Sequence, residues 1–303
     1  MLSGKAIVKD FKKNKLIYLM VLPVIIYLIL FCYKPMYGII IAFQRFRPGL
    51  GIERSPWVGL NNFVRFFKDI YFWRVVKNTF TISFLNILFT FPAPILLALL
   101  LNEVQCSWFK RTVQTVTYLP HFIAMVVVCG LINQFCRSDG LINDVIAFFG
   151  GERANLLIKT EMFYPIYIIS GIWKEIGWSS IIYLATLAGI DQEQYEAAKI
   201  DGAGRIQQMR YITLPGLMPT ISMLLILKMG QVLNIGMEKI LLLYHEMTYE
   251  VADVISTYVY RKGLIDADYS YSTAIGLFNS IVNIVFLVGA NKISKKLGQS
   301  GLF

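Results

Sequence analysis

Three long stretches of the chain, residues 78–102, 112–136 and 269–291, contain no Asp, Glu, Lys or Arg. About 20 mostly apolar residues is the length that an α-helix needs to cross the hydrocarbon core of a bilayer. The whole chain is 56% hydrophobic and only 16% charged, whereas a soluble domain is roughly 25% charged. The chain therefore has too few polar residues to cover a water-facing surface. The sequence predicts an all-α integral membrane protein and argues against a soluble enzyme, a nucleic-acid-binding module or a disordered chain.

Three further apolar stretches are interrupted by charge. They are residues 16–33, continuing after Lys34 as 35–44; residues 162–173 and 176–190, on either side of Lys174 and Glu175; and residues 211–227, continuing after Lys228 to Met237. We therefore expect six membrane-spanning helices. The first is expected to be a span and not a cleaved signal peptide, because it stays apolar past its charge and has no small-residue cleavage pattern.

Basic residues flank the first and last predicted spans, and the chain has a formal net charge of +10. Before the first span stand Lys5, Lys9, Lys12, Lys13 and Lys15 with Asp10 as the only acid, and after the last stand Lys292, Lys295 and Lys296. The excess of Lys and Arg in short cytoplasmic segments predicts both termini on the cytoplasmic side. The eight basic residues of loop 34–77, placed outside, do not fit this rule. We expect a cytoplasmic segment at 1–15 and a single transmembrane domain at 16–303.

The predicted cytoplasmic loop between spans four and five, about residues 190–216, has strong local signals. Asp191 is a favourable N-cap, and Gln194 completes a capping-box pattern. Residues 192–200 have helix-forming composition, the run Gly202-Ala203-Gly204 permits a sharp turn, and a second short helix is expected from Arg205. This helix–turn–helix could dock a soluble partner. The alternative, which composition alone favours, is an ordinary amphipathic loop at the membrane surface.

The fixed spacing of seven residues in this loop resembles the EAA signature of binding-protein-dependent ABC importer permeases. The seven are Glu196, Ala197, Ala198, Gly202, Ile212, Leu214 and Pro215. Similarity to the sugar-permease branch is carried by Pro35-Met-Tyr-Gly38, Trp57-Val-Gly-Leu-Asn-Asn-Phe63 and Ala252-Asp-Val-Ile-Ser-Thr-Tyr-Val-Tyr260. Similarity to the permeases that import polysaccharide-derived oligosaccharides through lipoprotein binding proteins is carried by Phe91-Pro-Ala-Pro94, Tyr118-Leu-Pro-His-Phe122 and Ile172-Trp-Lys-Glu-Ile-Gly-Trp178.

The resemblance implies a maltose-type fold of six transmembrane helices with a cytoplasmic coupling helix. In that reading the helix seats in a groove of a separate ATP-hydrolysing subunit, Glu196 pairs with a basic residue there, Gly202 makes the turn and Pro215 restarts the membrane helix. The implied partners are a second, related permease, two ATP-binding subunits and an extracytoplasmic binding protein, in a bacterial cell membrane. ATP and magnesium would bind to the partner ATPase, and this chain would need no cofactor.

The residues themselves agree with a chain that is not an enzyme. The sequence contains no GxxxxGK[ST] phosphate-binding loop and no reactive constellation of Ser, Cys, His or paired carboxylates. Neither the four cysteines (Cys32, Cys106, Cys129, Cys136) nor the two histidines (His121, His245) have the spacing of a metal site. We therefore expect no metal and no catalytic residue.

Two polar stripes are candidates for a solute pathway, because ionisable residues within spans usually face a cavity or one another. At 100° per residue, Lys228, Gln231, Asn234 and Glu238 share one side of span five, within roughly a 120° arc. In span four, Ser170, Lys174 and Trp178 share a face, with Glu175 beside them. Hydrogen-bonding groups and aromatic faces are what a sugar requires. The alternative is that these charges neutralise each other between helices or across a subunit interface, and Asn279 with Asn283 are expected to join helices.

Taken together, the sequence predicts the permease subunit of an ATP-driven importer that carries an oligosaccharide delivered by a binding protein. The alternative is a secondary transporter or channel for a polar solute. That alternative would need ion-coupling carboxylates or broken-helix pairs in internal repeats, and neither is evident in the sequence.

Overall fold

The computed structural model of the chain describes residues 13–298, 301 and 302. Apart from an isolated antiparallel bridge between Gln44 and Trp57, the regular structure of these residues is helical, so the predicted all-α class is confirmed. Lys5, Lys9, Asp10 and Lys12 of the predicted cytoplasmic segment lie outside the described residues. The described chain separates into two compact units, residues 13–68 with 262–277 and residues 69–261 with 278–298, 301 and 302.

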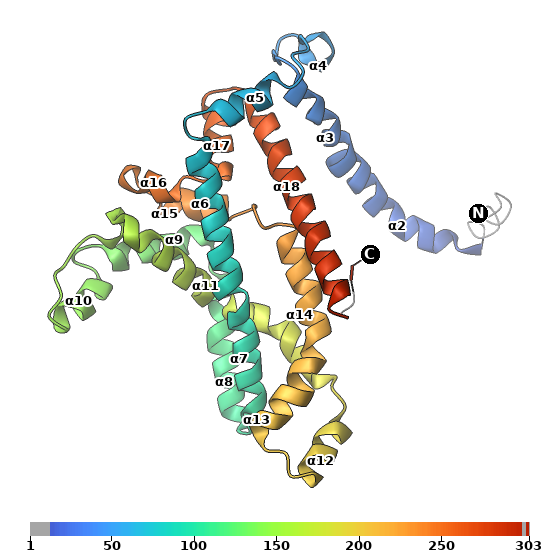
Figure 1. Cartoon of the computed structure of the whole chain (residues 1–303), viewed down its shortest axis with the longest axis vertical. Helices are drawn as coiled ribbons and strands as arrows, with labels where there is room; N and C mark the ends of the chain where they lie inside the picture. Colours follow the sequence, from blue (N-terminus) through green and yellow to red (C-terminus); the bar gives the residue numbers. More distant parts are fainter. Residues whose placement is uncertain (1–12, 299–300, 303) are drawn as a thin grey trace. The chain divides into compact units, whose positions relative to one another are not determined.

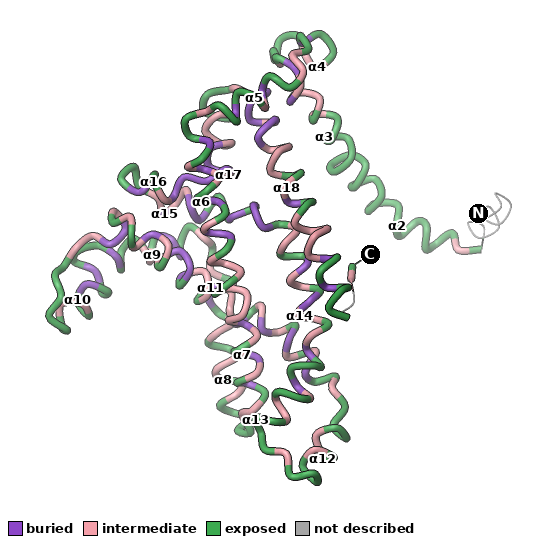
Figure 2. Tube along the Cα trace, in the orientation of Figure 1, coloured by how far each residue is buried: buried purple, intermediate pink, exposed green. Residues whose placement is uncertain are grey.

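The first unit begins with one long helical run, Lys15–Phe43. The run consists of α2 (Lys15–Tyr27), η1 (Leu28–Tyr33), α3 (Lys34–Met36) and η2 (Tyr37–Phe43), so the helix continues through the charge at Lys34. The residues of α2 are exposed, and Figure 2 marks them in green along the helix. The unit also holds α4 (Gly51–Arg54), α5 (Asn61–Lys68), most of η8 (Arg261–Ile265) and the start of α18 (Tyr269–Lys296).

The second unit contains the remaining helices (Figure 1). In chain order they are α6 (Phe72–Leu85), η3 (Asn86–Thr90), α7 (Pro92–Glu103), α8 (Ser107–Tyr118), η4 (Leu119–Phe122), α9 (Met125–Cys136), α10 (Leu141–Phe148), η5 (Leu156–Ile158), α11 (Thr160–Ala188), α12 (Gln192–Ile200), α13 (Arg205–Gln208), η6 (Met209–Thr213), α14 (Leu214–Met229), α15 (Met237–Leu243), η7 (Glu246–Thr248), α16 (Tyr249–Ala252), α17 (Ile255–Tyr260) and the rest of α18.

Helix α11 organises this unit, because it packs along α7, α8 and α14. Gly177 permits the approach to α8: a β-carbon at that position would lie 2.2 Å from the carbonyl oxygen of Thr117. On the same helix, Phe163 and Tyr167 are buried and join Ile82 of α6 and Ile240 of α15 in the main hydrophobic core. This arrangement brings α6, α11 and α15 together around a common interior.

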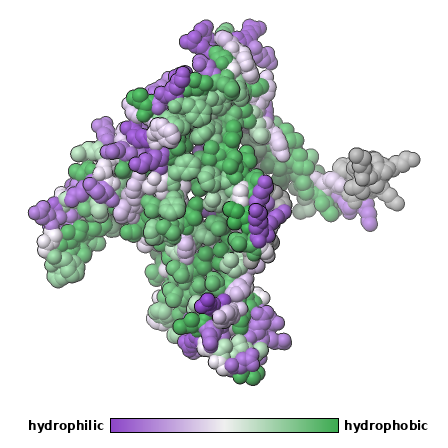
Figure 3. All heavy atoms as spheres, in the orientation of Figure 1, coloured by the Kyte–Doolittle hydropathy of each residue, from purple (hydrophilic) through white to green (hydrophobic). Residues whose placement is uncertain are grey.

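Five helical runs of the described residues are long and apolar enough to cross a membrane. They are Lys15–Phe43, Phe72–Glu103, Met125–Phe148, Arg205–Met229 and Tyr269–Lys296. The predicted fourth span is present as the continuous helix α11, but it is not among these five because Lys174 and Glu175 lower its hydropathy. Figure 3 shows a mostly hydrophobic surface over α7 and α8 and hydrophilic side chains around α12 and α13.

Two boundaries of the predicted spans are wrong. The expected uninterrupted span at 112–136 is broken, because the helix that begins as α8 ends in the Pro120-containing turn η4, and Ile123 and Ala124 are extended before α9 begins. Proline lacks the N–H that an α-helix interior needs. The expected continuation of span five to Met237 is also absent, because α14 ends at Met229.

Candidate functional site

The loop that carries the EAA-like residues has the predicted helix–turn–helix structure. Asp191 caps α12, but its carboxylate accepts from the N–H of Glu193 (3.0 Å) and not from that of Gln194, so the capping pattern is only half right. Gly202 has φ +77°, a left-handed conformation that glycine adopts at little cost. Hydrogen bonds from Ala203 N to Ala198 O (2.8 Å) and from Gly202 N to Lys199 O (3.1 Å) form a Schellman motif that ends the helix.

The seven EAA-like residues are distributed over both arms of this loop. Glu196 and Ala197 are exposed on α12 and Ala198 is half-buried beside them. Ile212 is half-buried in η6, and Leu214 with Pro215 is exposed at the start of α14. The two arms are joined by a 3.0 Å hydrogen bond between the hydroxyl groups of Tyr195 and Thr213. Within the described residues the Glu196 carboxylate makes no ion pair, so it is available to a partner.

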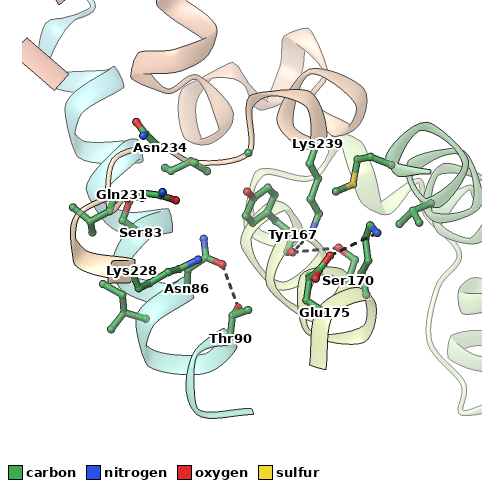
Figure 4. Close-up of a pocket in the computed structure, with 18 residues that line it drawn as sticks. Ser83, Asn86, Thr90, Tyr167, Ser170, Glu175, Lys228, Gln231, Asn234 and Lys239 are labelled. Atoms are coloured by element: carbon green, nitrogen blue, oxygen red, sulfur yellow. Dashed lines mark hydrogen bonds and ion pairs between the residues drawn. The ribbon is translucent and has the colours of Figure 1, made fainter. Parts of the chain in front are cut away.

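A cavity of about 190 Å³ lies in the second unit, where α6, η3, α9, α11, the end of α14 and α15 meet. Figure 4 shows its polar side chains converging from these elements. They are Ser83, Asn86, Thr90, Tyr167, Ser170, Lys174, Glu175, Lys228, Gln231, Asn234 and Lys239. Five of the seven predicted pathway residues are therefore in the wall of this cavity, namely Lys174, Glu175, Lys228, Gln231 and Asn234. Trp178 lines a second cavity instead, and Glu238 is an exposed residue that lines neither.

The predicted polar stripe on span five is wrong as a helical stripe. Residues 230–236 are not α-helical, so the 100° rotation per residue stops applying after Met229. Asn283 of α18 holds this segment through a hydrogen bond from Leu233 N (2.9 Å). The amides of Asn279 and Asn283 both donate to the side-chain oxygen of Asn234 (3.0 and 3.2 Å). The expectation that these two asparagines join helices is only partly right, because they join α18 to the non-helical segment after α14. The changed path brings Lys239, not Glu238, to the cavity.

The charged pair of α11 is tied to the break between α8 and α9. The Lys174 ammonium is buried and donates to the carbonyl oxygen of His121 (2.8 Å). The Glu175 carboxylate lies 2.9 Å from His121 Nδ1 and 3.6 Å from Lys174 Nζ. The His121 ring stacks on Trp178 with 4.5 Å between centroids. Lys174 therefore helps join two helices, as the packing alternative expected, whereas Glu175, 39% exposed, also faces the cavity.

Sequence reasoning missed five polar residues of the cavity wall: Ser83, Asn86, Thr90, Tyr167 and Lys239. Lys239 lies on α15, outside the five candidate spans; it is buried, donates to Tyr167 O (2.6 Å) and stands 4.3 Å from the centre of the Tyr167 ring. Burial lowers the pKa of Lys239 to about 8. Asn86 and Thr90 hydrogen bond to each other at 3.2 Å. Their i, i+4 spacing within an uncharged span was the signal that could have revealed them.

The cavity wall suits a polar, hydroxyl-bearing solute. It offers three ammonium groups, one carboxylate, side-chain amides and hydroxyl groups, which are donors and acceptors of the kind that orient a ligand in a pocket. The described residues contain no group of three or more His, Cys, Asp or Glu side chains that could hold a metal ion.

The family model described as "Binding-protein-dependent transport system inner membrane component" matches residues 83–299, well over half of the chain. The chain therefore belongs to this family, and the resemblance inferred from the EAA-like residues is confirmed. Members of this family are membrane components of transport systems, not enzymes.

The chain aligns with individual relatives over nearly its whole length. It is 49% identical to the polygalacturonan/rhamnogalacturonan transport system permease protein YteP of Bacillus subtilis (strain 168), over 96% of this chain and 91% of the relative. It is also similar to a chain in the crystal structure of a bacterial ABC transporter involved in the import of the acidic polysaccharide alginate (TM-score 0.89, 46% identity, 96% of this chain and 98% of that one). A chain of the bacterial alginate transporter in complex with an alginate pentasaccharide-bound periplasmic protein matches equally well (TM-score 0.90, 45% identity, 97% and 99% covered). The chain is accordingly an ABC importer permease.

Proposed function

We propose that this permease imports an acidic oligosaccharide. The observation that carries the proposal is the composition of the cavity wall, in which three lysines, Lys174, Lys228 and Lys239, stand with one carboxylate, Glu175. Such a wall favours a solute that is both hydroxyl-rich and anionic. The relatives whose names specify polygalacturonan and alginate support this choice, since both are polymers of uronic acids.

We propose that α12 is the contact through which ATP hydrolysis in a partner subunit drives transport. The exposed Glu196 and the small residues Ala197 and Ala198 suit a close contact with an ATP-hydrolysing subunit, and Gly202 ends the helix so that it stands at the tip of the loop. The chain would act with two such subunits, which bind the ATP and magnesium, and with a second, related permease. A binding protein outside the cytoplasm would deliver the sugar.

The helical run Arg205–Met229 provides a mechanical link between α12 and the cavity. Thr213, in the first half of the run, is hydrogen-bonded to Tyr195 of α12, and the last turn of the run carries Lys228 in the cavity wall. Twenty-five helical residues span about 37 Å at 1.5 Å per residue. The π-helical turn η6 leads into α14. Pro215 lies in the first turn of α14, where a missing N–H is tolerated, so the run stays helical. A displacement of α12 would thereby move the cavity wall.

The topology proposed is that of a bacterial inner-membrane protein with one transmembrane domain at 16–303 and both termini in the cytoplasm. This orientation places α12 and Gly202 on the cytoplasmic side, where ATP is available. A cysteine introduced at exposed Lys199 should therefore react with a membrane-impermeant maleimide only after the cells are opened.

The direct test is uptake in proteoliposomes that contain this permease, its partner permease and the ATPase, with the binding protein added outside. We expect ATP-dependent accumulation of radiolabelled oligogalacturonate or oligoalginate. Accumulation without nucleotide would favour the secondary transporter, and failure to import any oligosaccharide would contradict the proposed function.

A further inference from the structure

The second unit contains two cavities that share part of their walls. Next to the polar cavity lies a larger one of about 610 Å³, lined by α7, α11 and α14. Thr90, Glu175, Lys228 and Gln231 line both cavities. A solute that passes from one cavity to the other must pass these four side chains, which we call the neck.

The two charged residues of the neck, Glu175 and Lys228, differ in their existing hydrogen-bond and ion-pair partners. Glu175 is held by His121 and by Lys174, at 2.9 and 3.6 Å. The Lys228 ammonium, in contrast, has no hydrogen-bond or ion-pair partner among the described residues, and the side chain is exposed. An unpaired ammonium is costly within a membrane unless it faces water or a ligand. Its position in the last turn of α14 favours positive charge there, because the carbonyl end of a helix is negative.

The other two lysines of the polar cavity are not equivalent to Lys228. The ammonium of Lys174 is used by the carbonyl of His121 (2.8 Å), and that of Lys239 is used by the carbonyl of Tyr167 (2.6 Å) and lies over the Tyr167 ring. Both side chains are also buried. Among the three lysines of the polar cavity, Lys228 is therefore the one that can bind a new anionic partner without breaking an existing contact.

We propose that Lys228 determines the specificity of transport for acidic over neutral oligosaccharides. Its ammonium would bind the carboxylate of a uronate unit at the neck, a charge-assisted hydrogen bond stronger than one between neutral groups. Glu175, on the opposite side of the cavity in Figure 4, and Gln231 would receive the ring hydroxyls. A neutral sugar would leave the ammonium without an anionic partner. This inference deepens the function proposed above and depends on it.

The test compares two sugars of equal length and linkage, an oligogalacturonate and the corresponding neutral oligogalactose, in the reconstituted complex. Lys228→Met should lower uptake of the acidic sugar by about tenfold or more, the factor expected for a lost charge-assisted hydrogen bond, and leave neutral uptake unchanged or raised. Lys228→Arg should retain the preference. The matched control is Lys159→Met, an exposed lysine that lines neither cavity. The yield of assembled complex is measured for each variant.

The outcomes separate this inference from the proposed function. Equal loss of both sugars in Lys228→Met, or undiminished acidic uptake, would overturn the role of Lys228 while leaving the permease function intact. Import of the neutral sugar alone by the unaltered protein would overturn both the role of Lys228 and the proposed acidic substrate. If the unaltered complex imports neither sugar, the proposed function fails. In that case the role of Lys228 is tested by calorimetric titration of oligogalacturonate into the purified complex. A tenfold weaker affinity in Lys228→Met than in the unaltered complex supports the role. Equal affinity in the two complexes, or no binding to the unaltered one, overturns it.

Discussion

The turn after α12 and the segment after α14 lie at the two ends of the run Arg205–Met229, and their structures have different origins. At the first end, Gly202 and its neighbours are fixed by hydrogen bonds that span three to five residues of the chain. At the second end, residues 230–236 are fixed by Asn283, fifty residues away from Leu233. The element proposed to receive mechanical force is therefore locally encoded, whereas the wall proposed to receive the solute depends on long-range contacts.

Replacing Gly202 by Val tests the locally encoded end and should have the largest effect. A β-branched residue at φ +77° is strained by roughly 1–2 kcal/mol, and relief of that strain would displace α12. We expect normal membrane insertion but at least about a tenfold loss of sugar-stimulated ATP hydrolysis and uptake. Gly204→Val is the matched control, because Gly204 has an ordinary φ of −70°. If both variants behave alike, the left-handed turn is not required.

Replacing Asn283 by Leu tests the end that depends on tertiary contacts. The buried Leu233 N–H would lose its acceptor, at a cost of about 1–3 kcal/mol, and the cavity wall would loosen. We expect a several-fold loss of uptake and a lower melting temperature of the purified complex, with little change in ATPase docking. In Asn279→Leu the Leu233 contact remains, so a smaller loss is expected; equal losses would assign the effect to the Asn234 contacts instead.

Glu175 is the carboxylate of the polar cavity wall. Its pair with His121 is partly exposed, so the electrostatic contribution is only about 0.2–1 kcal/mol. Glu175→Gln should therefore lower uptake of acidic and neutral sugars alike, by about two- to fivefold. Glu161→Gln, on the same helix outside both cavities, should have no effect. A change confined to the acidic sugar would show that Glu175 acts through charge repulsion.

The smallest effect is expected at the start of α12. Asp191→Ala removes a cap worth about 1 kcal/mol to the helix, but the Tyr195–Thr213 contact still holds α12 in place. Affinity for the ATPase subunit should fall less than fivefold in a binding titration. Asp201→Ala, at the other end of the helix, should be neutral or slightly favourable, since an acidic residue is unfavourable there. A tenfold loss in Asp191→Ala would mean that the cap alone holds α12.

Much of this molecule follows from local patterns in the sequence. The charge-free stretches determined the all-α membrane class, because only long apolar helices satisfy their backbone groups in a bilayer. Asp191, Gly202 and the spacing of Glu196 to Pro215 determined the helix–turn–helix and the family. Caps and turns are read from a few adjacent residues, so they can be recognised without knowing the rest of the fold.

Only the tertiary structure decided which side chains meet in the cavity. The sequence placed Lys174, Glu175 and Lys228 correctly because a charge in an apolar helix rarely faces lipid. It could not show that α14 stops at Met229, that Asn283 holds the following segment, or that Lys239 enters the cavity in place of Glu238. The helical period carries no information once the chain leaves the helix, and the contacts that set its new path come from residues dozens of positions away.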